Sequence, residues 1–380
     1  MKNKVLKVLI LSFIVFLLLG LSVIIVNAQF TQIPKDNTKA LFKGLETLDM
    51  LIFISPQYKN DDKIISSINA YINTLNEDLG WNAKIIKIDE KENFYETIDK
   101  KIEFFYNIFN IKCCLMVGED INTPLAGDID YMEKPSIIPW ATIGGKKGYE
   151  SNERGIVSKE YKINICISLL YPTHEEKYEI KSKNIISAFE KFSKQRNDFS
   201  FSNISVFESL EISKNSKAIY QKLNDFSKLN YKQEPNDSDL KDSINKYNSL
   251  FFVHGHSNPV LTQISDDTLF TAEIVDEINS PFFCADGCYV SGWWSDKKDN
   301  DILDTSIKSQ WYGSKIFTSK NVKIMALGLL SQNGYLETVS FVENVVPVLL
   351  KGNTVAESII GQTFTGDFVL YGDPSFHFTN

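Results

Sequence analysis

The sequence has no long run of basic residues, no internal repeat and no low-complexity segment. Its 40 lysines and arginines are outnumbered by 48 aspartates and glutamates, so the net charge is −8. Nucleic-acid binding depends on neutralising phosphates, and this balance therefore argues against a nucleic-acid partner. The hydrophobic fraction of 43% is enough to bury the core of one large domain or of two closely packed ones.

Histidine and cysteine are also scarce, with four histidines and five cysteines in the chain. In an oxidising compartment, an odd number of cysteines leaves at least one thiol unpaired. Apolar, strand-like runs predict buried structural positions for four of them: Cys113, Cys114, Cys166 and Cys284. Cys288 differs because it follows such a run and sits beside a glycine. Its surroundings therefore favour a chemical role.

Apart from the N-terminus, no segment is apolar enough to span a membrane. At the N-terminus, three lysines precede an uncharged stretch at residues 8–26, and Ala28 closes a small-residue cleavage site. Residues 1–28 are therefore predicted to be a cleaved signal peptide or a retained N-terminal membrane anchor. Both alternatives place the rest of the chain outside the cytoplasm, as a secreted, periplasmic or cell-surface protein. It would contact the membrane only through an uncleaved N-terminal segment.

Apolar residues recur with the spacing of strands and helices in turn. After an exposed lead-in at 29–47, strands are predicted at Met50–Ile54, 83–88, Cys113–Val117, 163–170, 250–253, 282–285 and 322–327. Helices are predicted at 64–79, Phe94–Phe109, 181–196 and 339–350. This alternation predicts an α/β fold, a three-layer αβα sandwich with a mostly parallel sheet. We expect two side-by-side subdomains at 48–229 and 230–380, with a linker candidate at 234–237.

Two of the predicted strands run directly into small-residue turns that carry reactive side chains. The strand at 250–253 leads into His254, and the strand at 282–285 leads into Cys288. The carboxyl ends of parallel strands meet at one edge of a sheet, where ligands gather. A thiolate is a strong nucleophile, and an imidazole can take its proton or give one to a leaving amine. The pair therefore predicts the dyad of a cysteine peptidase.

The same turns resemble the His-Gly and Cys motifs of the gingipain family of caspase-like cysteine peptidases. The family pattern Pro-x-x-x-Ala-x-Gly-Cys is matched by Pro281, Ala285, Gly287 and Cys288, and its His-Gly turn by His254 and Gly255. Further segments similar to family motifs follow in the family's order at 50–56, 114–120, 128–131, 352–357 and 370–375.

This resemblance implies a caspase-like fold and an acyl transfer with no cofactor required. Cys288 would attack the carbonyl of a protein or peptide substrate and form a thioester, with His254 as general acid/base. The backbone amides of Gly255 and Cys288 would form the oxyanion hole. Two alternatives share the fold. One is a transpeptidase that passes the acyl group to another amine, and the other is a weakly active or inactive binding or assembly module.

Four residues near the dyad are candidates for a substrate pocket: His256, Asp286, Trp293 and Trp294. His256 would instead be the acid/base if the motif were displaced by two residues. The tryptophans, together with Trp311, fit a hydrophobic core equally well.

Metal ions give two further alternatives. His254, His256 and Asp286 together suit a zinc ion in a metal-dependent hydrolase, although no further ligand follows nearby. The acidic segment with Asp296, Asp299, Asp301 and Asp304 suits calcium in a structural role, or is a solvated loop.

Overall fold

The structure is a computed structural model. It describes residues 47–89, 94–118, 125–126, 134–135, 137–143, 151–152, 155–156, 161–172, 177–194, 196, 199–210, 217–225, 227–287, 290, 311–328, 341–364 and 368–379. The predicted signal peptide or anchor lies outside these ranges. Among the described residues, no helix is both long and apolar enough to cross a membrane.

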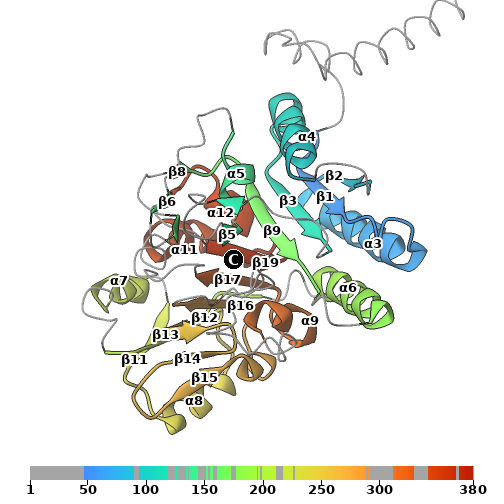
Figure 1. Cartoon of the computed structure of the whole chain (residues 1–380). Helices are drawn as coiled ribbons and strands as arrows, with labels where there is room; N and C mark the ends of the chain where they lie inside the picture. Colours follow the sequence, from blue (N-terminus) through green and yellow to red (C-terminus); the bar gives the residue numbers. More distant parts are fainter. Residues whose placement is uncertain are drawn as a thin grey trace, which may run out of the picture. The chain divides into compact units, whose positions relative to one another are not determined.

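A ten-stranded sheet forms the centre of the described residues (Figure 1). Its strands, in spatial order, are β11 (Lys228–Gln233), β10 (Asn203–Glu208), β12 (Leu250–His254), β16 (Phe282–Asp286), β17 (Ile324–Gly328), β19 (Phe368–Gly372), β9 (Cys166–Leu170), β3 (Cys113–Val117), β1 (Met50–Ile54) and β2 (Ala83–Lys87). The pairs from β11 to β17 and from β9 to β2 are parallel, whereas β17 and β19 run antiparallel. The predicted α/β fold with a mostly parallel sheet is therefore confirmed.

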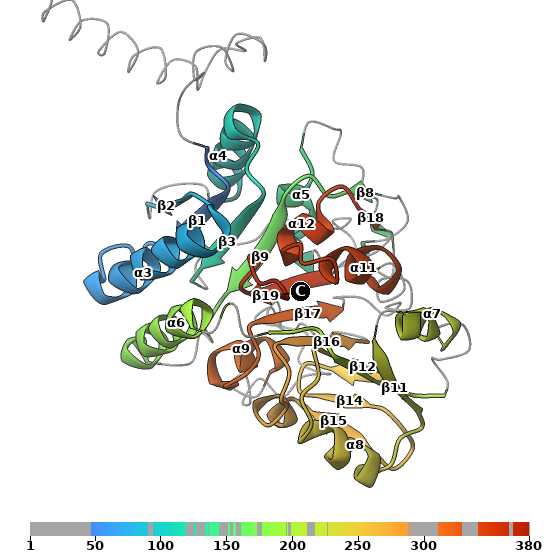
Figure 2. The same ribbon diagram turned by 180° about the vertical axis from the view of Figure 1, so that it is seen from behind.

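Helices cover both faces of this sheet, as Figure 2 shows from behind. One layer contains α3 (Asp62–Leu79), α6 (Tyr178–Ser193), α8 (Asp237–Ile244) and α9 (Lys315–Thr318). The other contains α4 (Phe94–Phe109), α5 (Ile138–Ala141), α7 (Lys217–Gln221), a π-helical turn (Phe341–Val345), α11 (Val346–Leu349) and α12 (Val355–Ile359). Three 3-10 turns occur among the described residues, at Lys222–Asp225, Ala272–Asp276 and Tyr312–Ser314.

Several small sheets surround the large one. A three-stranded antiparallel sheet directly follows β12 and contains β13 (His256–Asn258), β14 (Leu261–Gln263) and β15 (Leu269–Thr271). The two-stranded pairs are β8 (Tyr161–Lys162) with β18 (Thr363–Phe364), β4 (Leu125–Ala126) with β5 (Lys134–Pro135), and β6 (Ser151–Asn152) with β7 (Gly155–Ile156). The ring of Phe270 in β15 stacks on Phe283 of β16, so the three-stranded sheet packs against the face opposite α7.

Helix α3 illustrates how the sequence specifies these elements. Its buried side chains recur every three or four residues, which places them on one face: Ile64, Ile68, Tyr71 and Leu75. Asp61 caps the first turn by accepting hydrogen bonds from two backbone N–H groups. Gly80 ends the helix in the left-handed conformation, with φ of 65°, which glycine adopts without a steric penalty.

A buried group of polar side chains, here called the Arg196 network, ties the segment after β19 to the ends of α3 and α6. Arg196 donates to Asp78 and to Asp373, at 2.7 Å each. Tyr71 donates to Asp373 at 2.6 Å, and Ser375 accepts from Arg196 at 3.0 Å. Every nitrogen of the guanidinium is engaged, because its third nitrogen also reaches the carbonyl of Ser375. This network lies at the amino end of β17, where Asp373 is bonded to Lys323 through the backbone.

Two lysines beside this network hold the ends of helices. Lys191 donates to the backbone carbonyls of Ile316 and Ser319, at the end of α9. Lys323 donates to the carbonyls of Lys191 and Lys194, at the end of α6. Burial lowers the pKa of Lys191 to about 7 and that of Lys323 to about 8.

The segment at 197–247 contains two strands of the large sheet for which the sequence analysis made no prediction. Strands β10 and β11 were not predicted, because their polar residues resemble those of a loop. The linker candidate at 234–237 is the turn between β11 and α8, where Asn236 forms a capping box with Asp239. The predicted helix at 339–350 is, in its described part, a π-helical turn followed by the short α11. The division at residue 230 stays a prediction, although β10 precedes it and pairs with β11 and β12.

Candidate active site

Adjacent parallel strands bring three ionisable side chains into one row at the carboxyl ends of β10, β12 and β16. In the register of the strands, Glu208 of β10 lies opposite His254 of β12, and His254 lies opposite Asp286 of β16. Paired residues of neighbouring strands point to the same face, so the three side chains meet. Each is the last residue of its strand, and each is at least 96% buried.

His254 is placed between two carboxylates. Its Nδ1 donates to Oε1 of Glu208 at 2.9 Å, and its Nε2 lies 3.7 Å from Oδ2 of Asp286. The second oxygen of Glu208 accepts a hydrogen bond of 2.6 Å from the hydroxyl of Tyr231 on β11. The ring of His254 is thus oriented by a carboxylate that is itself held in place.

These neighbours change the acid–base behaviour of His254. Burial alone would lower its pKa, because an imidazolium loses hydration. The hydrogen bond to Glu208 and the negative charges of Asp286 and Glu208 outweigh burial, so the pKa of His254 is raised above its ordinary value. The site therefore favours the protonated imidazolium, which is the form that can give a proton to a leaving group.

Glycines allow the backbone to approach this row closely. A Cβ on Gly328, at the end of β17, would lie 2.2 Å from Oδ1 of Asp286. A Cβ on Gly287, where φ is 154°, would lie 2.2 Å from Oγ of Ser257. Only glycine fits at these two positions without a shift of the neighbouring atoms.

One of the two predicted donors of the oxyanion hole already makes a hydrogen bond within the chain. The N–H of Gly255 donates to the backbone carbonyl of Asp286 at 3.2 Å. An oxyanion could bind to this amide only after that bond had opened. The other predicted donor, Cys288, lies outside the described residues, as do the predicted pocket residues Trp293 and Trp294. Along the chain, Cys288 follows the end of β16 by two residues.

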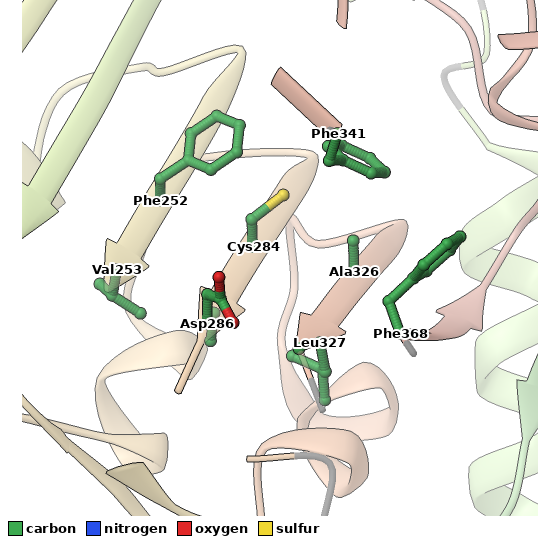
Figure 3. A pocket seen from close by; sticks show the side chains of 10 residues that line it. Phe252, Val253, Cys284, Asp286, Ala326, Leu327, Phe341 and Phe368 are labelled. Atoms are coloured by element: carbon green, nitrogen blue, oxygen red, sulfur yellow. The ribbon is translucent and has the colours of Figure 1, made fainter. Parts of the chain in front are cut away.

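A largely apolar cavity opens beside the row (Figure 3). It is lined by Phe252, Val253, Cys284, Ala285, Asp286, Ala326, Leu327, Gly328, Phe341 and Phe368. Figure 3 shows the thiol of Cys284 pointing toward the ring of Phe341, with the carboxylate of Asp286 at the end nearer β16's carboxyl terminus. Asp286, a predicted pocket residue, therefore both lines the cavity and faces His254.

The other candidates lie elsewhere. His256 is exposed on β13 and does not line the cavity. Trp311 is buried at the start of the 3-10 turn at Tyr312–Ser314 and is not a lining residue either. No group of three histidine, cysteine or acidic side chains suited to a metal ion occurs within the residues that the structure covers. The acidic segment at 296–304, the predicted calcium candidate, lies outside them.

The four cysteines predicted to be structural are buried and free: Cys113, Cys114, Cys166 and Cys284. Burial raises the pKa of all four thiols, because the thiolate would lose its hydration. The thiolate is the reactive form of cysteine, so these four are unreactive at neutral pH.

Sequence reasoning missed Glu208 and Tyr231. The one available signal was the alternation in β10, where Ile204, Val206 and Glu208 fall on one face of the strand. A carboxylate that ends the apolar face of a strand must find a partner when it is buried. The partner could not be named from the sequence, because it depends on which strands are neighbours.

No protein-family model matches this chain, and no curated protein sequence matches it. Solved structures do match. The Arg-specific cysteine proteinase gingipain R (RgpB) has a TM-score of 0.56 and 12% identity, over 87% of this chain and 78% of that chain. The complex of Porphyromonas gingivalis RgpB pro- and mature domains has a TM-score of 0.57 and 12% identity, over 87% and 79%. The chain has the gingipain fold.

A third structure, described as that of a protease, agrees with a TM-score of 0.54 and 10% identity over 87% of this chain. The resemblance inferred from the turns around His254 and Cys288 is therefore confirmed at the level of the caspase-like gingipain fold. At this identity the likeness is one of fold, and the chemistry must be argued from the residues of the row itself.

Proposed function

We propose that the chain is an exported cysteine endopeptidase, with Cys288 as nucleophile and His254 as general acid/base. The observation that carries the proposal is the hydrogen bond between His254 and the buried Glu208. A histidine held by a buried carboxylate is the base–orienter pair of nucleophilic catalysis. In the sequence, the candidate nucleophile Cys288 follows β16, which is the strand beside β12.

The roles follow from the chemistry of these groups. The thiol of Cys288 would lose its proton to His254 and attack the substrate carbonyl, forming a tetrahedral oxyanion and then a thioester. The imidazolium, stabilised by Glu208 and Asp286, would give its proton to the departing amine. A water molecule would then attack the thioester while His254 accepts a proton from it. The carbon–sulfur bond would break, the peptide would leave as a carboxylic acid, and His254 would return the proton to the thiolate of Cys288.

Export is proposed from residues 1–28, whose lysines and apolar stretch are typical of a signal peptide or an anchor. An exported peptidase acts on proteins or peptides outside the cytoplasm. No step of the proposed reaction needs a metal ion or an organic cofactor, because thiol, imidazole and water supply the nucleophiles and protons.

The test is cleavage of a mixed peptide library by the purified protein and by its Cys288→Ala and His254→Ala variants, with products identified by mass spectrometry. We expect cleavage by the parent and a loss of at least about a thousandfold in both variants. Cys114→Ala is the matched control, because it removes a thiol that is buried in the sheet. It should keep the activity of the parent.

The other outcomes separate the alternatives. Equal cleavage by the parent and by Cys288→Ala would remove Cys288 as nucleophile. Products joined to an added amine would identify a transpeptidase. Activity that a chelator abolishes and a thiol reagent spares would indicate a metal-dependent hydrolase. If nothing is cleaved, and a thiol reagent labels Cys288 no faster than the buried cysteines, the chain is a binding or assembly module.

A further inference from the structure

Tyr231 belongs to neither of the two motifs that predicted the site, yet its hydroxyl makes a hydrogen bond to Glu208. It lies on β11, at the edge of the large sheet, and is half-buried. In the strand register it is opposite Val206, so it shares the face of Glu208, two residues further along β10. Its hydroxyl donates to Oε2 of Glu208 at 2.6 Å, while Oε1 of the same carboxylate accepts from His254 at 2.9 Å.

The hydroxyl of Tyr231 is a donor throughout the physiological range. Burial and the neighbouring charge of Glu208 raise the pKa of Tyr231 well above its ordinary value, so it keeps its proton. A carboxylate can only accept at neutral pH, which fixes the direction of the hydrogen bond. The chain of bonds therefore runs from two donors, Tyr231 and His254, to the two oxygens of one carboxylate.

Other groups also face this part of the site. Asp286 and Cys284 approach from β16, and Tyr220 approaches from α7. The ring of Tyr220 lies 6.0 Å from that of Tyr231, but its buried hydroxyl has no hydrogen-bond partner among the described residues. The two neighbouring tyrosines thus differ in one respect that matters here, which is the hydrogen bond to Glu208.

We propose that Tyr231 is a positioning residue of the candidate site. Its hydroxyl holds Oε2 of Glu208, and this hydrogen bond limits how tightly His254 binds its proton. The inference rests on the proposed function, because it assigns Tyr231 a part in the same proton transfers. Its effect on His254 can nevertheless be measured without any peptidase activity.

The physical argument compares the two protonation states of His254. While His254 is protonated, its positive charge compensates the buried Glu208. When His254 gives up its proton, Glu208 becomes a buried carboxylate with less compensation, and a donor such as Tyr231 stabilises that state most. Tyr231 therefore makes it easier for His254 to lose its proton. Without it, a histidine between two carboxylates would retain the proton too strongly to alternate between acid and base.

The test is a titration of the histidine ring resonances by NMR in the purified protein and in Tyr231→Phe. The resonance of His254 is identified by its loss in His254→Gln. We expect His254 of Tyr231→Phe to bind its proton about three- to tenfold more tightly, which moves its midpoint up by about 0.5 to 1 pH unit. Tyr220→Phe is the matched control and should leave the midpoint in place. An unchanged or lower midpoint in Tyr231→Phe would overturn the inference.

A second variant keeps the test informative if Tyr231→Phe changes the packing of the edge strand. In a Glu208→Gln background, the carboxylate through which Tyr231 acts is gone, so adding Tyr231→Phe should not raise the midpoint of His254 further. An equal rise in both backgrounds would mean that Tyr231 acts by another route, and would contradict the inference.

Activity measurements separate this inference from the proposed function. If the protein is a peptidase, the acidic limb of kcat/KM should move up in pH by the same amount in Tyr231→Phe, with KM unchanged at high pH. A shifted NMR midpoint in a protein that cleaves nothing would support the inference and reject the function. Cleavage by Tyr231→Phe with an unshifted pH profile and an unshifted midpoint would support the proposed function and reject the inference.

Discussion

The two ends of β17 carry two different kinds of buried polar cluster. At its amino end, the Arg196 network surrounds a guanidinium that stays charged at any physiological pH, and every nitrogen of that group has a partner. At its carboxyl end, beside Gly328, the row of Glu208, His254 and Asp286 surrounds an imidazole whose charge can change.

The comparison shows that burial and charge alone do not identify a functional site. The side chains of both clusters are largely buried, and in both a central basic group lies between two carboxylates; in the Arg196 network, Asp78 also contacts Nε2 of His377, at 3.1 Å. They differ in whether the basic group can exchange a proton near neutral pH. Arg196 can serve only structure, whereas His254 can serve chemistry.

The largest expected effect comes from breaking the Arg196 network. Arg196→Met should lower the free energy of unfolding by about 3–5 kcal/mol, because it leaves Asp373 buried without its cationic partner and leaves Asp78 with His377 alone. Urea denaturation measures this. Lys222→Met is the control, because Lys222 and Glu343 form an exposed pair with side chains 64% and 37% exposed. It should change stability by less than about 1 kcal/mol, and an equal loss in both variants would contradict the distinction.

An intermediate effect is expected from filling the space beside the row. Gly328→Ala should lower the free energy of unfolding by about 1–3 kcal/mol, because the added methyl group overlaps the carboxylate of Asp286. Since Asp286 must then move away from His254, the pKa of His254 should also fall. Denaturation and the NMR titration of His254 check both parts. A variant as stable as the parent, with His254 unchanged, would show that the row has more room than the structure indicates.

The two lysines beside the Arg196 network should make stability rise with pH. In the folded chain Lys191 loses its proton near pH 7 and Lys323 near pH 8, whereas an unfolded lysine keeps its proton to about pH 10.4. Between these values the unfolded state binds more protons, so the free energy of unfolding increases with pH. Lys191→Met should flatten this increase, as measured by urea unfolding at pH 6 to 10. An unchanged slope would argue against a neutral Lys191.

The smallest effect should come from the row, where the free energy of unfolding should decrease rather than increase with pH. The folded pKa of His254 is raised, so the folded state binds the proton more tightly than the unfolded state does. The resulting stabilisation is fully present below about pH 6.5 and is lost as the pH rises through the folded pKa. His254→Gln should remove this dependence and leave that of the lysines. The check is a comparison of urea midpoints from pH 5 to 9, and a His254→Gln curve parallel to that of the parent would contradict it.

The sequence was sufficient to predict one part of this arrangement. Strands such as β1, β3, β12 and β16 are buried along their whole length, so their apolar runs stand out. His254 and the segment before Cys288 were found because glycine-flanked turns follow such strands. The same logic failed for β10 and β11, whose polar side chains make hydrogen bonds rather than facing a purely apolar layer. Asn230 bonds Ser243 of α8, and Ser205 and Asn203 bond the segment just after that helix.

The residues around His254 were harder to predict than His254 itself. Glu208 reaches His254 only because β10 lies beside β12, and that neighbourhood is set by the packing of the whole sheet. Tyr231 requires one further strand, β11, and a register that points its ring toward Glu208. Local patterns determine which segments are strands. The row depends on the order of strands in the sheet, and local patterns carry no information about that order.

The position of β19 has a consequence for how the protein is made. Among the strands of the large sheet, β19 is the last in the sequence, yet it lies between β17 and β9 in the interior of the sheet. While the ribosome is still synthesising the chain, the sheet therefore lacks an inner strand, and its two groups of strands cannot join until residue 372 has emerged. Until then, the two groups of strands lie without the strand that joins them.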